Sequence, residues 1–202
     1  DLQGADCVID IRASNIYLRE IPQVRINVNT AQTLVPMARC LNMDFIWVHA
    51  AATVLESTLA YSLNALDTPT LVVEMGVGNR LTRAYGEQLL AGILNLMAAL
   101  GMWTGPVTPP REPIISTDHH VSFVNSPCPG IFIPGAEHTA RVAKGEPLGL
   151  VADPLTGEIL QTLRSPSDGL LFTLREYPVV YEGSLIARIL DENTDGKGEA
   201  AL

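Results

Sequence analysis

One stretch of this sequence carries the strongest fold signal: Pro69-Thr70-Leu71-Val72-Val73-Glu74-Met75-Gly76. Its apolar run is continuous and rich in β-branched residues, and it lacks the alternation of a half-exposed strand. Such a run is typical of a strand that is covered on both faces of a parallel sheet. The stretch therefore predicts a buried strand that ends in a carboxylate and is followed by a glycine-bearing loop.

Two runs of the same kind lie upstream, Cys7-Val8-Ile9-Asp10-Ile11 and Asp44-Phe45-Ile46-Trp47-Val48-His49. Leucines recur at helical spacing over residues 51–66, which predicts a helix between the second and third strands. A longer helix is predicted over residues 81–100, with one apolar stripe of Leu81, Tyr85, Leu89, Ile93, Met97 and Leu100. Strands that alternate with helices predict an α/β fold with an open, mostly parallel sheet and flanking helices.

The composition changes after Trp103. Residues 105–113 are proline-rich, which predicts a linker or a crossing strand, and beyond them glycine and proline separate short β-rich runs. The pattern Val142-x-x-Gly145-x-x-Leu148-x-x-Val151 recurs as Val180-x-x-Gly183-x-x-Ile186-x-x-Ile189, which resembles the repeat of biotinyl- and lipoyl-type barrels. We predict an α/β part at 1–104, a small glycine-rich all-β, barrel-like domain at 105–190, and a flexible tail at 191–202.

The charge balance excludes several classes of partner. The 202 residues carry 13 Lys+Arg and 22 Asp+Glu, a net charge of −9, so the chain has no basic footprint for nucleic acid or for an anionic membrane surface. No apolar run reaches the ~18–20 residues of a transmembrane helix, and no basic-then-apolar signal peptide is present. The three cysteines show no C-x-x-C pairing, which indicates buried thiols in a reducing compartment. We expect a cytoplasmic protein.

Polar residues at the strand ends are the candidates for chemistry, because ligands of open α/β sheets bind beyond the carboxyl ends of the strands. Asp10 and Arg12 follow the first strand, His49 ends the second, and Glu74 ends the third. A partly desolvated carboxylate such as Glu74 suits a general base. A structural alternative exists for each of the other three: a loop ion pair for Asp10 and Arg12, and a hydrogen-bonded core histidine for His49. Glu74 carries the strongest functional signal of the four.

Histidines elsewhere in the chain carry a weaker signal. Asp118-His119-His120 is a dense polar cluster, but adjacent histidines on a strand point to opposite faces and chelate one metal poorly. We expect a surface turn there, and a solvent-facing side chain at His138. The sequence contains no His-Glu-x-x-His, Gly-x-Ser-x-Gly or phosphate-binding glycine loop.

Taken in order, four segments resemble the succinylglutamate desuccinylase/aspartoacylase family: Val8-Ile9-Asp10-Ile11-Arg12, Ile21-Pro22-Gln23-Val24-Arg25, the stretch 69–76, and Val142-x-Lys144-Gly145-Glu146-x-Leu148-Gly149. The resemblance implies a zinc-dependent deacylase with a carboxypeptidase-like α/β catalytic domain, of which 1–104 is the C-terminal part. It implies hydrolysis of the amide of an N-acyl amino acid or a similar small molecule, with zinc as cofactor. Glu74 stands in the family's Val-Glu-x-Gly setting as the general base, and Arg12, Arg25 and His49 are the expected substrate-binding residues.

This sequence departs from the family at the metal ligands. The His-x-x-Glu pair near the family's N-terminus, with the early strands and an oxyanion-stabilising arginine, has no counterpart. Arg12 occupies the position of the third ligand, a histidine, and a guanidinium only donates hydrogen bonds, so no metal ligand is identifiable. We interpret Arg12 as a loss of the ligand, with His49 as an alternative replacement. The start at Asp1 rather than Met predicts that the chain is N-terminally incomplete.

Two functions from different classes follow from the resemblance and its departures. The first is a zinc-dependent amidohydrolase, in which this chain alone is expected to be inactive and a longer protein or a partner supplies the missing ligands. The alternative is a non-catalytic relative that binds a small anionic metabolite or acts as an assembly subunit. A homo-oligomer is compatible with both, since an exposed sheet edge invites pairing.

Overall fold

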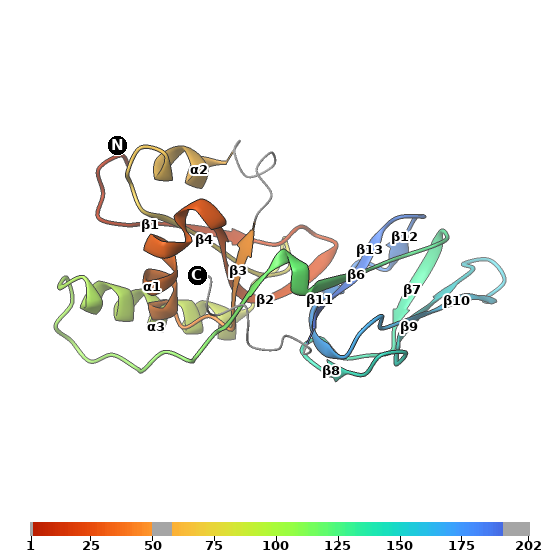
Figure 1. The fold of residues 1–202 in the computed structure, drawn as a ribbon. Coiled ribbons are helices and arrows are strands. Elements are labelled where there is room, and N and C mark those ends of the chain that lie inside the picture. Colours follow the sequence, from red (N-terminus) through yellow and green to blue (C-terminus); the bar gives the residue numbers. More distant parts are fainter. Residues whose placement is uncertain (1, 50–57, 192–202) are drawn as a thin grey trace.

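A computed structural model describes residues 2–49 and 58–191 of the chain (Figure 1). The described part forms, in order, β1 (Val8–Ala13), β2 (Leu18–Asn27), the 3-10 helix η1 (Val28–Thr30), α1 (Ala31–Cys40), β3 (Phe45–His49), α2 (Leu59–Asn64), β4 (Thr70–Gly76), α3 (Arg83–Ala99), β5 (Ile114–Thr117), the 3-10 helix η2 (Asp118–His120), β6 (Val121–Asn125), β7 (Gly130–Pro134), β8 (Arg141–Val142), β9 (Pro147–Ala152), β10 (Ile159–Arg164), β11 (Gly169–Arg175), β12 (Val179–Val180) and β13 (Leu185–Asp191).

The three apolar runs form the strands that the sequence predicts. β4 lies beside β1 in parallel, with Arg12 level with Glu74, and β3 is parallel to its neighbours β2 and β5. The proline-rich residues 105–113 have no regular structure and lead directly into β5. The mixed α/β architecture is therefore confirmed for the first half of the chain.

β2 is the strand that the periodicity did not identify, and it changes the topology. It lies antiparallel to β4, parallel to β3, and antiparallel to β11 at its first residues, where Glu20 faces Thr173. The sheet is therefore mixed rather than mostly parallel. It reaches nine strands within the described ranges, because β2 joins the α/β part to β11, β13 and β6 of the C-terminal part.

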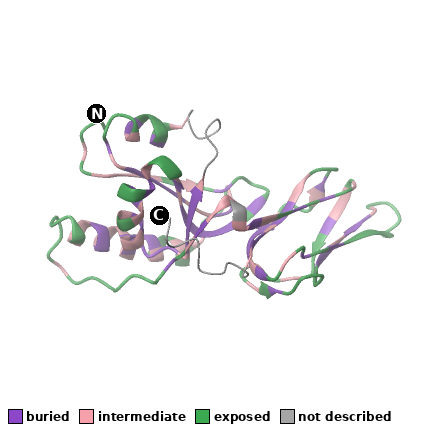
Figure 2. Ribbon diagram, viewed as in Figure 1, coloured by how far each residue is buried: buried purple, intermediate pink, exposed green. Residues whose placement is uncertain are grey.

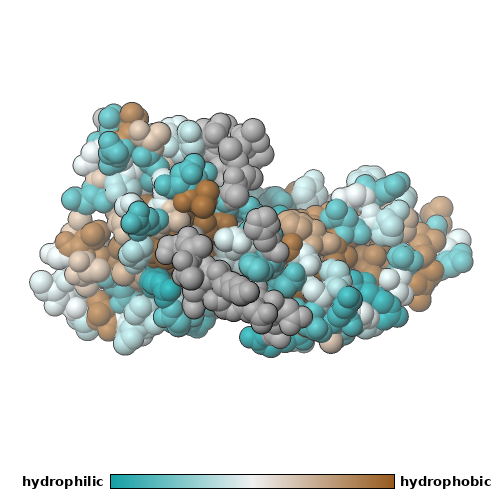
Figure 3. Space-filling view, viewed as in Figure 1, coloured by the Kyte–Doolittle hydropathy of each residue, from teal (hydrophilic) through white to brown (hydrophobic). Residues whose placement is uncertain are grey.

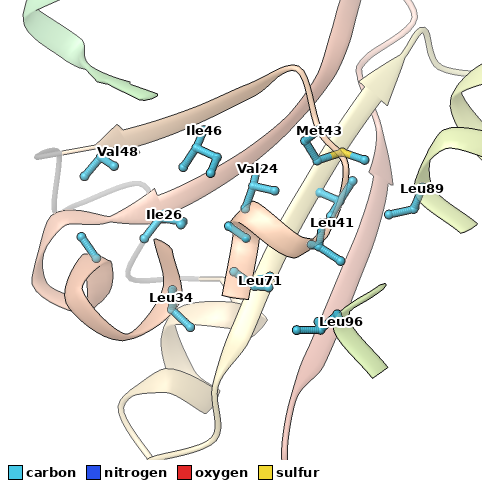
Figure 4. Packing of buried hydrophobic residues seen from close by; sticks show 13 residues of the cluster. Val24, Ile26, Leu34, Leu41, Met43, Ile46, Val48, Leu71, Leu89 and Leu96 are labelled. Carbon is cyan, nitrogen blue, oxygen red and sulfur yellow. The ribbon is translucent and has the colours of Figure 1, made fainter. Parts of the chain in front are cut away.

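Two helices cover one face of this sheet. Leu34 of α1 and Leu89 and Leu96 of α3 pack on Val24 and Leu71 of the strands in one buried cluster (Figure 4). The helices approach closely at Gly92, where an added Cβ would lie 1.9 Å from the Leu41 carbonyl oxygen. A glycine is therefore required at this contact.

The helix predicted over residues 81–100 is present, but its first residue and its buried face differ from the prediction. α3 begins at Arg83, so Leu81 precedes it and is fully exposed, at 101%. The buried residues of α3 are Leu89, Gly92, Asn95 and Leu96, a face rotated from the predicted stripe. Of the helix predicted over 51–66, the structure describes only α2; residues 50–57 lie outside the described part, as do residues 192–202 of the predicted tail.

The C-terminal strands form two sheets around a second core. β10, β9, β7 and β12 make a four-stranded antiparallel sheet, and its Phe132 and Val151 pack against Leu171 and Ile186 of the large sheet. Figure 2 shows these strands buried along their inner side. The all-β texture is confirmed, but the predicted barrel is not: no sheet closes among the described strands, since the small sheet ends at β10 and β12. Figure 3 shows apolar surface at the far end of this part of the molecule, and Leu155, in the turn between β9 and β10, is 93% exposed.

Candidate functional site

The face of the large sheet opposite α1 and α3 is polar. A β-bulge in β2 lies between Glu20 and Gln23, and beyond it successive side chains alternate between the two faces. Val24 and Ile26 therefore point to the helices, while Gln23 and Arg25 point to the opposite face. Three other strands contribute to the same polar face, with Arg12 from β1, Trp47 and His49 from β3, and Glu74 from β4.

A cavity of about 340 Å³ lies on this face. Three of the four site residues predicted from the sequence line it together: Arg12, Arg25 and Glu74. The other lining residues come from β2, η1, α1, α2 and β4, and they are Ile26, Asn27, Asn29, Thr30, Leu34, Thr58, Ala60, Tyr61, Asn64, Ala65, Thr70 and Val72. The walls are therefore partly apolar, and two guanidinium groups and one carboxylate from β1, β2 and β4 meet on them.

Local hydrogen bonds hold in place the wall of the cavity that α2 and η1 form. The Asn64 side chain of α2 donates to the Thr70 carbonyl at 3.0 Å and accepts from the Thr70 amide at 2.9 Å, which ties α2 to β4. Asn27 at the end of β2 accepts from the Asn29 amide at 2.9 Å and so starts the turn into η1. Two asparagines thus hold the helical wall against the strands.

Each arginine in the cavity is paired with a carboxylate. Arg25 Nε lies 2.8 Å from Glu74 Oε2, and Arg12 Nε donates to Asp10 Oδ2 at 3.0 Å. The pKa of Arg12 is raised, first by its hydrogen bond with Asp10 and further by the charges of Asp10 and Glu74. The Arg12 guanidinium is therefore charged at every physiological pH, and among residues 2–49 and 58–191 neither arginine has a hydrogen bond or ion pair through Nη1.

His49 lies near the cavity but does not line it. Its Nδ1 is 2.9 Å from Asp118 Oδ1, and its ring lies against Trp47 with centroids 4.3 Å apart. Burial is the main cause that lowers the pKa of His49 to about 4, although Asp118 opposes it, so the imidazole is neutral at pH 7. A neutral imidazole that donates from Nδ1 presents Nε2 as an acceptor, and this buried atom has no hydrogen-bond partner among the residues that the structure describes.

Two predictions about the outer histidine clusters are wrong. Asp118 does not sit in a plain surface turn: it begins η2 and accepts from Trp47 Nε1 at 2.9 Å as well as pairing with His49. His138 is not solvent-facing, because its Nε2 lies 3.0 Å from the Phe172 carbonyl oxygen, and burial lowers its pKa. In both cases a strand distant in sequence supplies the partner, which local composition does not reveal.

A buried charge cluster beside the cavity was missed by the sequence reasoning. The side chain of Glu20 is only 1% exposed; its Oε1 accepts from Arg188 Nη1 of β13 at 2.8 Å, and its Oε2 accepts from Thr173 Oγ1 and from Gln23 Nε2. Burial raises the pKa of Glu20, while Arg188 opposes this shift. A signal was available in the charged residue that interrupts the apolar run of β13, Leu185-Ile186-Ala187-Arg188-Ile189-Leu190.

The residues present do not fit the zinc ion that the resemblance implies. Arg12 and Arg25 bring donor-only groups to the cavity, and Glu74 is held by Arg25. Within the described ranges, no three His, Cys, Asp or Glu side chains lie close enough together to hold a metal ion. The chemistry of the described part is therefore that of a guanidinium–carboxylate site.

Comparisons with solved structures define the class of fold: this chain has the fold of succinylglutamate desuccinylase/aspartoacylase structures. The product-bound ectoine utilization protein EutE (DoeB) from Ruegeria pomeroyi matches with a TM-score of 0.78 at 19% identity over 92% of this chain and 58% of that one. A succinylglutamate desuccinylase/aspartoacylase from Rhodobacter sphaeroides matches with a TM-score of 0.77 at 17% identity, over 95% and 60%. A succinylglutamate desuccinylase from Silicibacter sp. TM1040 matches with a TM-score of 0.79 at 15% identity, over 93% and 59%.

These comparisons confirm the resemblance at the level of the fold. No protein-family model and no curated protein matches the sequence. The chain spans about three-fifths of the length of these structures. None of the helices within residues 2–49 and 58–191 is long and apolar enough to cross a membrane.

Proposed function

We propose that this chain binds a small carboxylate-bearing molecule of the N-acylated amino acid class in the cavity between β1, β2, β4 and α2. The observation that carries the proposal is the meeting of Arg12, Arg25 and Glu74 on one partly apolar cavity. Small-molecule sites combine apolar walls with a few convergent polar groups and typically measure about 300–1,000 Å³. At about 340 Å³ the cavity suits a ligand of metabolite size.

The polar groups match the polar ends of such a ligand. A free carboxylate would accept from Arg12, whose side chain is 38% exposed and retains an unused Nη1. Glu74 is held through Oε2, which leaves Oε1 to accept the N–H of the ligand's amide. The acyl chain would then lie against Val72 and Ala60. An amide next to a carboxylate is the arrangement that an N-acyl amino acid presents.

A titration measures this binding directly. N-acetyl-aspartate is titrated into the purified protein by calorimetry, with its dimethyl ester as the ligand without free carboxylates. We expect Arg12→Gln to weaken the acid about tenfold or more, since a charge-assisted hydrogen bond is worth about 1.5–3 kcal/mol. Arg83→Gln is the matched control, because Arg83 is 91% exposed on α3. Equal affinity for the acid and the ester would refute carboxylate recognition.

Hydrolysis of the amide is the second candidate, and the fold likeness favours it. In this reading Glu74 takes a proton as general base, so it must first leave Arg25, which lies 2.8 Å away. The zinc-dependent chemistry of the family is not assigned to the described residues, whose donors do not fit the metal. Release of the amino acid from N-acetyl-aspartate, lost in Glu74→Gln, would favour this candidate over simple binding.

A further inference from the structure

Two carboxylates compete for the guanidinium of Arg25. Its Nε lies 2.8 Å from Glu74 Oε2 on the cavity side, and its Nη2 lies 3.8 Å from Glu20 Oε1 on the interior side. Glu20 is the more deeply buried of the two, with 1% of its side chain exposed against 16% for Glu74. The free-energy cost of an unpaired charge rises with its burial, so leaving Glu20 without a cation would destabilise the fold more than leaving Glu74 without one.

Arg188, in the C-terminal part of the chain, is the cation that pairs with Glu20. Its Nη1 donates to Glu20 Oε1 at 2.8 Å, the same oxygen that Arg25 approaches from 3.8 Å. Thr173 and Gln23 donate hydrogen bonds to the other oxygen of this carboxylate, Oε2. With Glu20 already neutralised, Arg25 is left to Glu74, where its guanidinium lines the cavity.

Trp47 places the two arginines side by side. The guanidinium carbon of Arg25 lies 5.2 Å from the centroid of this ring, and that of Arg188 lies 5.5 Å from it. Two like charges around one ring repel each other unless an anion balances them, and Glu20 Oε1 is within 4 Å of both. The arrangement depends on all three charges together.

We propose that Arg188 is a positioning residue of the cavity: by satisfying Glu20, it keeps Arg25 on Glu74, where Arg25 can meet a ligand. Without Arg188, the nearest remaining cation for Glu20 is Arg25, which would turn from the cavity towards the interior. A residue of β13 thereby controls a site built on β1, β2 and β4. The ligand-binding consequence rests on the proposed function, whereas the position of Arg25 does not.

The test compares one single variant with one double variant. Arg188→Met removes the cation and leaves Glu20 unpaired, so we expect the affinity for N-acetyl-aspartate to fall about tenfold. Glu20→Gln/Arg188→Met removes the competing carboxylate too, so Arg25 should return to Glu74 and the affinity should recover to within about threefold of the unmodified protein. If Arg188 had only a structural role, the double variant would bind as weakly as the single variant or more weakly.

A second measurement does not depend on any ligand. The Nε of Arg25 is buried 2.8 Å from Glu74 Oε2, as an ion pair without hydrogen-bond geometry. Its Nε–H signal in ¹⁵N NMR, assigned through Arg25→Lys, therefore reports whether the guanidinium keeps this buried position beside Glu74. This Nε–H should be protected from hydrogen exchange with solvent in the unmodified protein and in the double variant. It should lose that protection in Arg188→Met. Arg83→Met is the control for the loss of an exposed guanidinium. If the unmodified protein binds none of the ligand but the NMR pattern appears, the proposed function fails and the positioning role stands. An unchanged Arg25 signal in Arg188→Met would overturn the positioning role.

Should Arg188→Met fail to fold, the double variant decides alone, because it exchanges a buried ion pair for neutral groups. Protected Arg25 Nε–H in that variant supports the proposal, since Arg25 then stays on Glu74 without Arg188 or a charged Glu20. Loss of protection would show that Arg188 supports Arg25 in some other way and would overturn it.

Discussion

Lowering the pH should destabilise this protein through His49 by a predictable amount. His49 is buried beside Trp47, and its pKa is lowered from 6.5 to about 4. As the pH falls below 6.5, the unfolded chain takes up a proton at this residue while the folded protein does not, so stability is lost between pH 6.5 and 4. Between pH 7.5 and 4.5 the loss from His49 alone is about 2.5 kcal/mol, at roughly 1.36 kcal/mol per pKa unit.

The assay is urea unfolding followed by circular dichroism at pH 7.5 and 4.5, for the unmodified protein and for His49→Asn. The asparagine amide can donate to Asp118 as Nδ1 does, but it does not titrate, and all other groups are shared. The unmodified protein should lose about 2.5 kcal/mol more than the variant over this range. Equal losses would show that burial does not hold the imidazole neutral. A smaller loss in the unmodified protein would mean that Asp118 outweighs burial and raises the pKa.

The remaining predictions concern packing and metal binding. Gly92→Ala should destabilise the fold by about 1–3 kcal/mol in thermal or urea unfolding, because the added Cβ would lie 1.9 Å from the Leu41 carbonyl oxygen. Gly86→Ala is the control on the same helix. It should be neutral or stabilising, because no atom lies within 4 Å of the added Cβ. Phe172→Ala should cost about 3–5 kcal/mol, since the ring is fully buried between Phe45 and Trp47, and a loss below 1 kcal/mol would contradict that packing. In a longer protein that carries the family's His-x-x-Glu pair, Arg12→His should increase zinc uptake measured by metal analysis, and no gain would count against Arg12 as the lost ligand.

β3 and β4, two of the strands that the sequence identified, are buried by largely apolar residues. β4 is recognisable because Leu71-Val72-Val73 is apolar without interruption, and the same holds for β3. β2 was not recognised because Arg19, Glu20, Gln23 and Arg25 interrupt its apolar residues. Glu20 and Gln23 are the buried members of this set, and Glu20 takes its partners Arg188 and Thr173 from strands that are distant in the sequence. Such long-range partners leave no local pattern.

Some residues of the candidate site were predictable from the sequence, and others became evident only from the fold. Arg12 and Glu74 end neighbouring parallel strands, so the rule that ligands bind at carboxyl ends brings them together from the sequence alone. Arg25 entered through the family resemblance, and the cavity confirms only that it lies beside the other two. The arrangement of Glu20, Arg188 and Trp47 required the fold, because Glu20 and Arg188 are 168 residues apart in the sequence and meet across β11, which lies between β2 and β13.

We propose that guanidinium groups, and not a metal ion, hold the ligand's carboxylate in this cavity. The most direct measurement is calorimetric titration of N-acetyl-aspartate into the protein with excess EDTA and again with added zinc. We expect the same dissociation constant under both conditions and a loss of affinity of about tenfold or more in Arg12→Gln. Binding that disappears with EDTA, returns with zinc and is unaffected by Arg12→Gln would contradict it.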